Sequence, residues 1–182
     1  MSEAPHFPVG VDTNRPTPAR IYDYMLKGSN YFQVDRFAAE QILTVAPEIR
    51  DAAWSNRGFH QRAAKFIAQC GVRQFIDIGS GLPTVGNTHD VVQQIHPGAL
   101  TDDYKPPAAA EGFRAVFDTA TEHMYFRSKA KVERFFHGLE LVAPHEKAEP
   151  GVTFTGLWGA EDVELADSDG SRWLYCGVAR KP

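Results

Sequence analysis

The residues best suited to chemistry lie in one short segment, residues 74–84, which reads QFIDIGSGLPT. Apolar and β-branched residues typical of a strand lead to Asp77, and Gly79 and Gly81 follow with one residue between them. Because glycine has no Cβ, such a turn lets a ligand approach the backbone more closely than other residues permit. The pattern is typical of a turn that holds a nucleotide-like cofactor.

A helix is expected directly after this turn, over residues 87–95, which completes the order strand, glycine turn, helix. A tight turn without any ligand has the same order, and a glycine pair alone does not separate the two interpretations. A nicotinamide-dependent oxidoreductase is disfavoured, because Thr84 stands where a third glycine would follow Gly81.

Length and composition bound the class of protein. A chain of 182 residues with 43% hydrophobic and 23% charged residues is typical of one soluble globular domain. Its net charge of −4, without a basic block, argues against nonspecific binding to nucleic acid or to an anionic membrane. Neither a signal-peptide pattern nor an apolar run of bilayer length is visible, so we expect a cytoplasmic protein. Cys70 and Cys176 are isolated and are expected to be small buried thiols.

The elements that must position the turn are expected on both sides of it. Residues 1–14 lack periodicity and are expected to form a flexible arm, followed by a single domain over 15–182. Helical periodicity makes residues 15–71 a helical cap. Its helices are expected over about residues 18–27, 34–45 and 47–70. The apolar stripe of the second helix predicts four buried side chains: Phe37, Ala38, Ile42 and Val45.

The part of the chain after the glycine turn has mixed patterns. Two further helices are expected, over about residues 108–120 and 129–137, the second with Ser128 as its N-cap. Short strands are expected at residues 139–142, 152–154 and 173–178. The chain is therefore predicted to be an α/β protein.

Longer motifs make the chain recognisable. They are RIYDYMLKG at residues 20–28, NYF at 30–32, NR at 56–57, FFHGLELVAP at 135–144 and YCGVARK at 175–181. Together with the glycine turn, they resemble a bacterial family of S-adenosylmethionine-dependent methyltransferases long catalogued as a domain of unknown function. The resemblance covers about residues 12–98 and 100–182. It implies a Rossmann-like class I methyltransferase core, S-adenosylmethionine as cofactor and a small-molecule methyl acceptor.

The chain departs from that family directly after residue 99. The segment HPGA at residues 96–99 resembles the entry to the second strand of the family, whereas LTDD at 100–103 resembles a segment after the fifth. The gap corresponds to about 80 residues, from an internal deletion or an omitted segment, so residues 72–182 are predicted to form a truncated core that lacks several central strands. The first strand would then lose both neighbours, which favours self-association through exposed strand edges.

The resemblance implies eight residues at the cofactor: Asp77, Gly79, Ser80, Gly81, Tyr22, Tyr24, Arg57 and Asn87. The two tyrosines would cover the sulfonium through cation–π contacts, although ordinary helix packing is an alternative for both. Asp23, between them, is expected to be a solvated acid, and Arg57 has a surface position as its alternative.

Asp102 and Asp103 lie about 20 residues beyond the glycines, where an acid that binds the ribose would be expected. The alternative is that this spacing is accidental, because residues 99–101 are too short for a convincing strand. His89 is a candidate base or a capping residue. No catalytic residue is assigned, because methyl transfer depends mainly on alignment. No metal site is assigned, because the seven histidines include no His-x-x-x-His pair.

Two functions remain open at this point. One is an S-adenosylmethionine-dependent methyltransferase acting on an unknown acceptor. The other is a non-catalytic remnant of the same family that binds a ligand or a partner chain.

Overall fold

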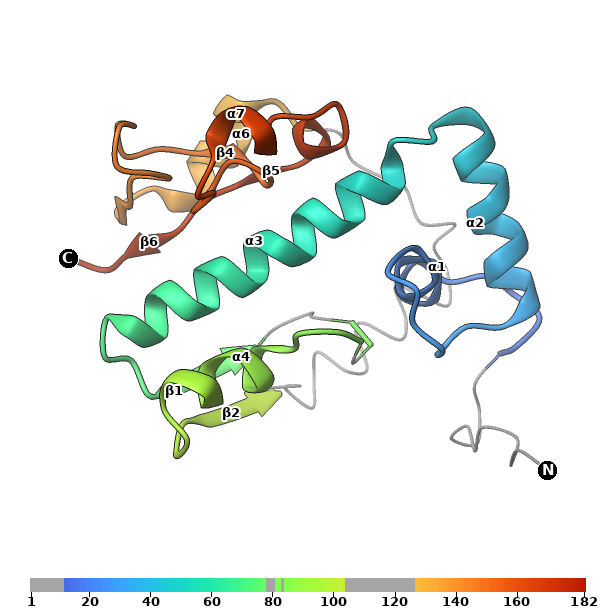
Figure 1. Ribbon diagram of the computed structural model, residues 1–182, viewed down its shortest axis with the longest axis horizontal. Helices are drawn as coiled ribbons and strands as arrows, with labels where there is room; N and C mark the ends of the chain where they lie inside the picture. Colours follow the sequence, from blue (N-terminus) through green and yellow to red (C-terminus); the bar gives the residue numbers. More distant parts are fainter. Residues whose placement is uncertain (1–11, 78–80, 83, 104–126) are drawn as a thin grey trace.

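The computed structural model describes residues 12–77, 81, 82, 84–103 and 127–182. A long central helix, α3 (Ile49–Gln69), runs across the molecule and separates two groups of elements (Figure 1). The glycine-turn region lies on one side of α3 and the C-terminal elements lie on the other, while the first two helices pack at its N-terminal end. The structure is therefore a mixed α/β arrangement built around one helix.

The elements around the candidate site are α1 (Pro18–Met25), α2 (Gln33–Val45), α3, β1 (Gln74–Asp77), α4 (Thr88–Ile95) and β2 (Leu100–Asp103). The C-terminal elements are α6 (Lys129–Glu133), the 3-10 helix η1 (Arg134–Phe136), β3 (Glu140–Leu141), β4 (Thr153–Phe154), α7 (Val163–Ala166), the 3-10 helix η2 (Gly170–Trp173), β5 (Tyr175–Cys176) and β6 (Ala179–Arg180). The helices expected over 18–27, 34–45, 47–70 and 87–95 are confirmed, with ends that differ by a few residues. The helix expected over 108–120 lies outside the described residues.

Local signals in the sequence explain where α1 begins and ends. Thr17 is its N-cap, with an Oγ1 that accepts a hydrogen bond from the Arg20 N–H at 3.4 Å, and Pro18 occupies the first helical position. The chain leaves the helix at Lys27, which has a φ of 59°, and then reaches Gly28. A Cβ at Gly28 would lie 2.3 Å from Asp23 Oδ1, so only glycine fits this turn.

The buried stripe predicted for α2 is wrong in part. Phe37 is 63% exposed and Val45 is 82% exposed, whereas Asp35 and Ala39 are completely buried. The reason is that α2 turns the Asp35 carboxylate toward α1, where Arg20 binds it. Positions four residues apart on a helix share a face, so this rotation buries Ala39 and leaves Phe37 outside.

The helix α3 contributes side chains to three apolar clusters. Ala53 packs in an apolar cluster with α1 and α2, and Ala63 packs in a second cluster with Trp158. Ala64 and Ala68 pack in a third cluster, which includes α4 and the residue before β2. The small alanine side chains on several faces of α3 let all these elements approach it closely.

The glycine-turn region contains a two-stranded parallel sheet, in which β1 pairs with β2 and Asp77 lies in register with Asp103. The expectation that residues 99–101 are too short to belong to a strand is therefore wrong. The expectation that the first strand loses both neighbours is also wrong at one edge. Backbone N–H and C=O groups need partners, and β2 supplies them on that side. Within the described part of the chain, the other edge of β1 has no partner strand.

The C-terminal elements form two short antiparallel pairs, β3 with β6 and β4 with β5. Phe154 stacks on Tyr175 across the second pair, with ring centroids 4.8 Å apart. Cys176 is buried as expected, but Cys70 is exposed because it caps the end of α3, where the chain turns away. No helix in the described ranges is long and apolar enough to cross a membrane.

Candidate cofactor site

The glycine turn joins the end of β1 to the start of α4, and two of its glycines have different roles. Gly81 has a φ of 78°, and a Cβ at this position would meet no atom of the described structure within 4 Å. Gly86 has a φ of 65°, but a Cβ there would lie 1.9 Å from Gln61 Nε2 of α3. Gly86 therefore serves packing, whereas Gly81 leaves an open backbone that a ligand could approach. Gly79 and Ser80 lie outside the described residues.

Asp77, the last residue of β1, is held in place by side chains from two helices. Its Oδ2 accepts a hydrogen bond from Thr88 Oγ1, in the first turn of α4. The same Thr88 oxygen lies 3.0 Å from His60 Nε2 on α3, and His60 Nε2 lies 3.9 Å from Asp77 Oδ2. The Asp77 side chain is 15% exposed. The structure thus places the predicted Asp77 at the turn, as a largely buried acid whose position is fixed by these contacts.

Arg57 is a buried cation beside this turn. The residue is only 5% exposed, and its surface alternative is therefore wrong. Its Nη2 donates a weak 3.4 Å hydrogen bond to Thr84 Oγ1, in the glycine loop. Among the side chains that the structure describes, which do not include those of residues 100–103, its Nε has no hydrogen-bond partner and its guanidinium has no carboxylate within 4.0 Å. A buried charge without a counter-charge is costly, so this position suits an anionic ligand group.

The two predicted tyrosines do not act together. The Tyr22 ring faces Arg57, with 5.7 Å between the guanidinium carbon and the ring centroid. The Tyr22 hydroxyl donates to the Ala53 carbonyl at 3.2 Å and accepts from Asn56 Nδ2 at 3.1 Å. These contacts fix Tyr22 on the same part of α3 that carries Arg57.

Tyr24 faces α2 instead. Its hydroxyl donates to Glu40 Oε1 at 3.1 Å, and its ring packs edge-on against Tyr31 at 4.9 Å. Residues two apart on a helix point in different directions, which explains why Tyr22 and Tyr24 diverge. The structure brings Tyr22 to Arg57 but does not bring Tyr24 there.

Asn87 is the N-cap residue of α4 and closes the glycine loop. Its Oδ1 accepts from the Thr84 N–H at 3.2 Å, and its own N–H donates to Asp90 Oδ2 at 3.1 Å. Its role as a cofactor contact stays a prediction. His89 is half exposed and lies 3.3 Å from Asp90 Oδ1, so it faces away from the Asp77 network.

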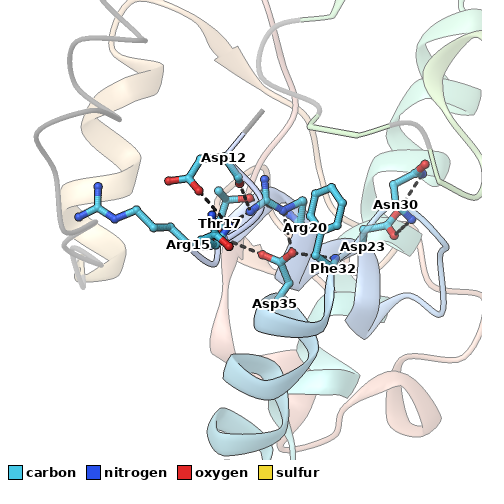
Figure 2. Close-up of polar contacts among 9 residues, drawn as sticks. Asp12, Arg15, Thr17, Arg20, Asp23, Asn30, Phe32 and Asp35 are labelled. Carbon is cyan, nitrogen blue, oxygen red and sulfur yellow. Dashed lines mark hydrogen bonds and ion pairs between the residues drawn. The ribbon is translucent and has the colours of Figure 1, made fainter. Parts of the chain in front are cut away.

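Sequence reasoning did not assign a role to Asp35, which anchors the loop before the site. Its carboxylate is fully buried and accepts from the Thr17 N–H at 2.9 Å, the Phe32 N–H at 2.9 Å and Arg20 Nε at 2.7 Å (Figure 2). Arg20 Nη2 also donates to the carbonyl oxygen of Arg15. The signal that could have found this pair is the spacing of an arginine in one helix and an acid in the first turn of the next.

The expectation that Asp23 is a solvated acid is wrong, because Asp23 is 0% exposed. Its Oδ2 accepts from the Asn30 N–H at 2.8 Å, and its Oδ1 lies 3.4 Å from Asn30 Nδ2 (Figure 2). The carboxylate turns inward because the loop after α1 folds over it and presents N–H groups to it. Asp23 and Asp35 together shape the connection between α1 and α2.

A separate pocket of about 760 Å³ lies between the C-terminal half of α3 and the loops at residues 143–146 and 158–161. Arg62 lines it and donates to the carbonyl oxygens of Thr155 and Trp158 at 2.7 and 2.5 Å. None of the turn residues described above contributes to its wall. Arg62 therefore ties the C-terminal loops to α3, on a different face of that helix from Arg57.

The geometry is that of a mixed α/β protein with a glycine turn between a strand and a helix, and two solved structures share the fold. One is a candidate methyltransferase from Thermobifida fusca YX, with a TM-score of 0.73 and 24% identity over 96% of this chain and 98% of that one. The other is a DUF574 family protein from Streptomyces avermitilis MA-4680, with a TM-score of 0.73 and 22% identity over 94% and 99% of the two chains.

The family model described as S-adenosyl methyltransferase matches residues 6–102 and 99–182. The chain therefore belongs to the S-adenosyl methyltransferase family, as the resemblance of its motifs predicted. The two matched segments overlap at residues 99–102. No curated protein matches the chain.

Proposed function

We propose that this protein binds S-adenosylmethionine at the turn between β1 and α4 and transfers its methyl group to a small-molecule acceptor. Membership of the S-adenosyl methyltransferase family supports the general class. The observation that carries the proposal is the buried Arg57 guanidinium, which lacks an acidic partner in the described structure and lies beside the glycine loop.

The residues of the site fit the chemical groups of this cofactor. Its methionine part carries a carboxylate, which would supply the missing counter-charge to Arg57 through charge-assisted hydrogen bonds. The open backbone at Gly81 would let the cofactor lie against the turn. Asp77 would accept hydrogen bonds from a cofactor amine or hydroxyl, and Gly79, Ser80 and Asn87 remain proposed contacts. Tyr22 would cover the site through the ring that already faces Arg57.

The strand β2 offers candidates for an acid that binds the ribose. Asp103 is the register partner of Asp77, so both stand at the carboxyl ends of adjacent parallel strands. Ligands of open α/β sheets bind beyond these ends. We therefore propose that Asp103 or its neighbour Asp102 holds the ribose hydroxyls.

The cofactor would supply an electrophilic methyl group on a sulfonium. Transfer of this methyl to a lone pair of the acceptor would break the carbon–sulfur bond and leave the sulfur as a neutral thioether. The contribution of the protein is alignment: Arg57 and Asp77 fix the two ends of the polar part, and Tyr22 limits access of water. Such alignment accounts for most of the rate enhancement when the acceptor is already nucleophilic.

We also propose that β1, α4 and β2 form the first βαβ unit of a Rossmann-like class I core, and that the core is truncated after Ala99. The parallel pairing of β1 with β2 across α4 supports the unit. The meeting of the two family matches at residues 99–102 supports the truncation.

A ligand-binding protein without turnover is the second candidate. It is favoured by one observation: β1 has a second edge without a partner strand in the described structure. In a class I core, further strands pair with the sheet on that side. Their carboxyl ends would extend the surface on which the acceptor binds next to the cofactor. Binding of the cofactor without methyl transfer to any acceptor would distinguish this candidate from the enzyme.

Calorimetric titration tests the proposal with three ligands: S-adenosylmethionine, its demethylated product and its decarboxylated analogue. We expect the first two to bind with micromolar affinity and the analogue to bind at least about tenfold more weakly. Arg57→Gln should weaken the first two by a similar factor and leave the analogue unchanged, because its missing carboxylate is the partner of Arg57. Lys65→Gln, an exposed change of the same charge on α3, is the control.

Three outcomes would count against the proposal. Equal effects of Arg57→Gln on ligands with and without the carboxylate would remove Arg57 from that role. The absence of heat with all three ligands, from a sample that unfolds cooperatively, would favour a non-catalytic member of the family that does not bind this cofactor. Preference for NAD would favour an oxidoreductase.

A further inference from the structure

Three side chains from three elements form a continuous polar chain behind the glycine turn. His60 comes from α3, Thr88 from the first turn of α4 and Asp77 from the end of β1. His60 Nε2 lies 3.0 Å from Thr88 Oγ1, and Thr88 Oγ1 donates to Asp77 Oδ2. These three hydrogen-bonded side chains link α3, the helix that carries Arg57, to Asp77, the acid of the candidate cofactor site.

The positions of the protons in this group of side chains follow from which atoms are able to donate a hydrogen bond and which only accept one. An ionised carboxylate only accepts, so the single hydroxyl proton of Thr88 goes to Asp77. The Thr88 oxygen then accepts from His60, which requires a proton on His60 Nε2. In a neutral imidazole the other nitrogen is unprotonated, so His60 Nδ1 carries a lone pair. This atom is buried and has no hydrogen-bond partner among the described residues.

The surroundings of His60 favour its neutral form. Burial lowers the pKa of His60, Asp77 raises it by a smaller amount, and the Arg57 guanidinium lowers it further. Among the described residues, these are the charges that act on the ring: Asp77 faces it from β1 and Arg57 from its own helix, while α4 contributes the uncharged Thr88.

We propose that neutral His60 is a positioning residue that holds Asp77, through Thr88, in the orientation required for cofactor binding. This inference rests on the proposed function, because Asp77 is taken as part of the cofactor site. Protonation of His60 would place a second cation beside Arg57 and put a buried N–H at Nδ1, where no acceptor lies. It would also attract the Asp77 carboxylate directly, since only 3.9 Å separates it from His60 Nε2. This attraction would draw Asp77 away from its bound orientation.

The test compares cofactor affinity at pH 7.5 and pH 5.5 for the full chain and three variants. The affinity of the unaltered protein for S-adenosylmethionine should fall by about threefold on acidification, a modest change because the pKa of His60 is lowered by burial. His60→Gln keeps an amide donor for Thr88 but does not titrate, so its affinity should change by less than about twofold. Thr88→Val breaks the link and should weaken binding about fivefold at both pH values. His89→Gln changes a histidine that does not contact His60, Thr88 or Asp77 in this hydrogen-bonded group, so this variant should retain the pH dependence.

Nitrogen-resolved NMR of the histidine rings adds a measurement that needs no cofactor. At pH 7.5, His60 should be neutral with its proton on Nε2. A proton on Nδ1, or a pH dependence in His60→Gln equal to that of the unaltered protein, would overturn the inference while the proposed function stands. Absence of cofactor binding by the folded protein at both pH values would overturn the proposed function, and with it the role of His60 in binding.

Discussion

Arg20 Nε lies 2.7 Å from Asp35 Oδ2, and both side chains are almost entirely buried between α1 and α2. The Asp35 carboxylate also accepts from two backbone N–H groups, so both of its oxygens have hydrogen-bond partners (Figure 2). The pair sets the rotation of α2 and the path of the loop that leads to Asn30. It is therefore the main polar determinant of the N-terminal helices.

Removal of one member of this pair should strongly destabilise the protein. Asp35→Ala leaves the Arg20 cation buried without its partner, and we expect the free energy of unfolding to fall by about 3–5 kcal/mol. Denaturant-induced unfolding followed by circular dichroism measures the change. Glu40→Gln in the exposed pair with Arg36 is the matched control and should leave stability nearly unchanged. Similar losses in the two variants would contradict the role given to Asp35.

The turn after α1 should tolerate only glycine at position 28. Gly28→Ala would place a methyl group 2.3 Å from Asp23 Oδ1, which must move and lose its bond to the Asn30 N–H. We expect a loss of about 1–3 kcal/mol in the free energy of unfolding. Gly98→Ala is the control, because a Cβ at Gly98 meets nothing within 4 Å. A neutral Gly28→Ala would show that the carboxylate is free to move.

The two thiols should differ in reactivity. Burial raises the pKa of Cys176 to about 12, whereas Cys70 is exposed. At pH 8, an aromatic disulfide reagent should therefore react rapidly with one thiol per chain, and Cys70→Ser should abolish this fast phase. A fast phase that survives Cys70→Ser would show that Cys176 is accessible.

The same pKa shift predicts a loss of stability at alkaline pH. The folded-state pKa of Cys176 is higher than the unfolded value, so its contribution is complete below about pH 8.5 and is lost as the pH rises toward 12. Cys176→Ala should flatten this part of the curve of unfolding free energy against pH. Parallel curves for the two proteins would contradict the assignment.

The uncovered strand should promote self-association. Ile76 on β1 is 64% exposed, on a strand of a class that is normally covered on both faces. We expect sedimentation velocity to show concentration-dependent association, and Ile76→Lys to reduce it. Phe37→Lys removes an equally exposed apolar side chain from α2 and is the control. A stronger effect of Phe37→Lys would place the contact surface on the helices instead.

Much of the local structure follows from short-range signals. Thr17 and Pro18 start α1, Gly28 ends its loop, and the apolar run before Asp77 forms a strand. The long motifs identified the family, which the family model confirms. These features depend on neighbouring residues or on matched motifs, so they are visible in the sequence.

The sequence by itself determined the family, the positions of the helices and the glycine turn. Only the tertiary structure decided which polar side chains are buried and what they meet. Asp23 looked solvated and is buried, and Phe37 looked buried and is exposed. Residues 99–101 looked too short for a strand, yet residues 100–103 pair with β1. The physical reason is that burial of a charge and pairing of a strand both depend on partners far along the chain. Arg20 and Asp35 create one such environment, and β1 creates the other.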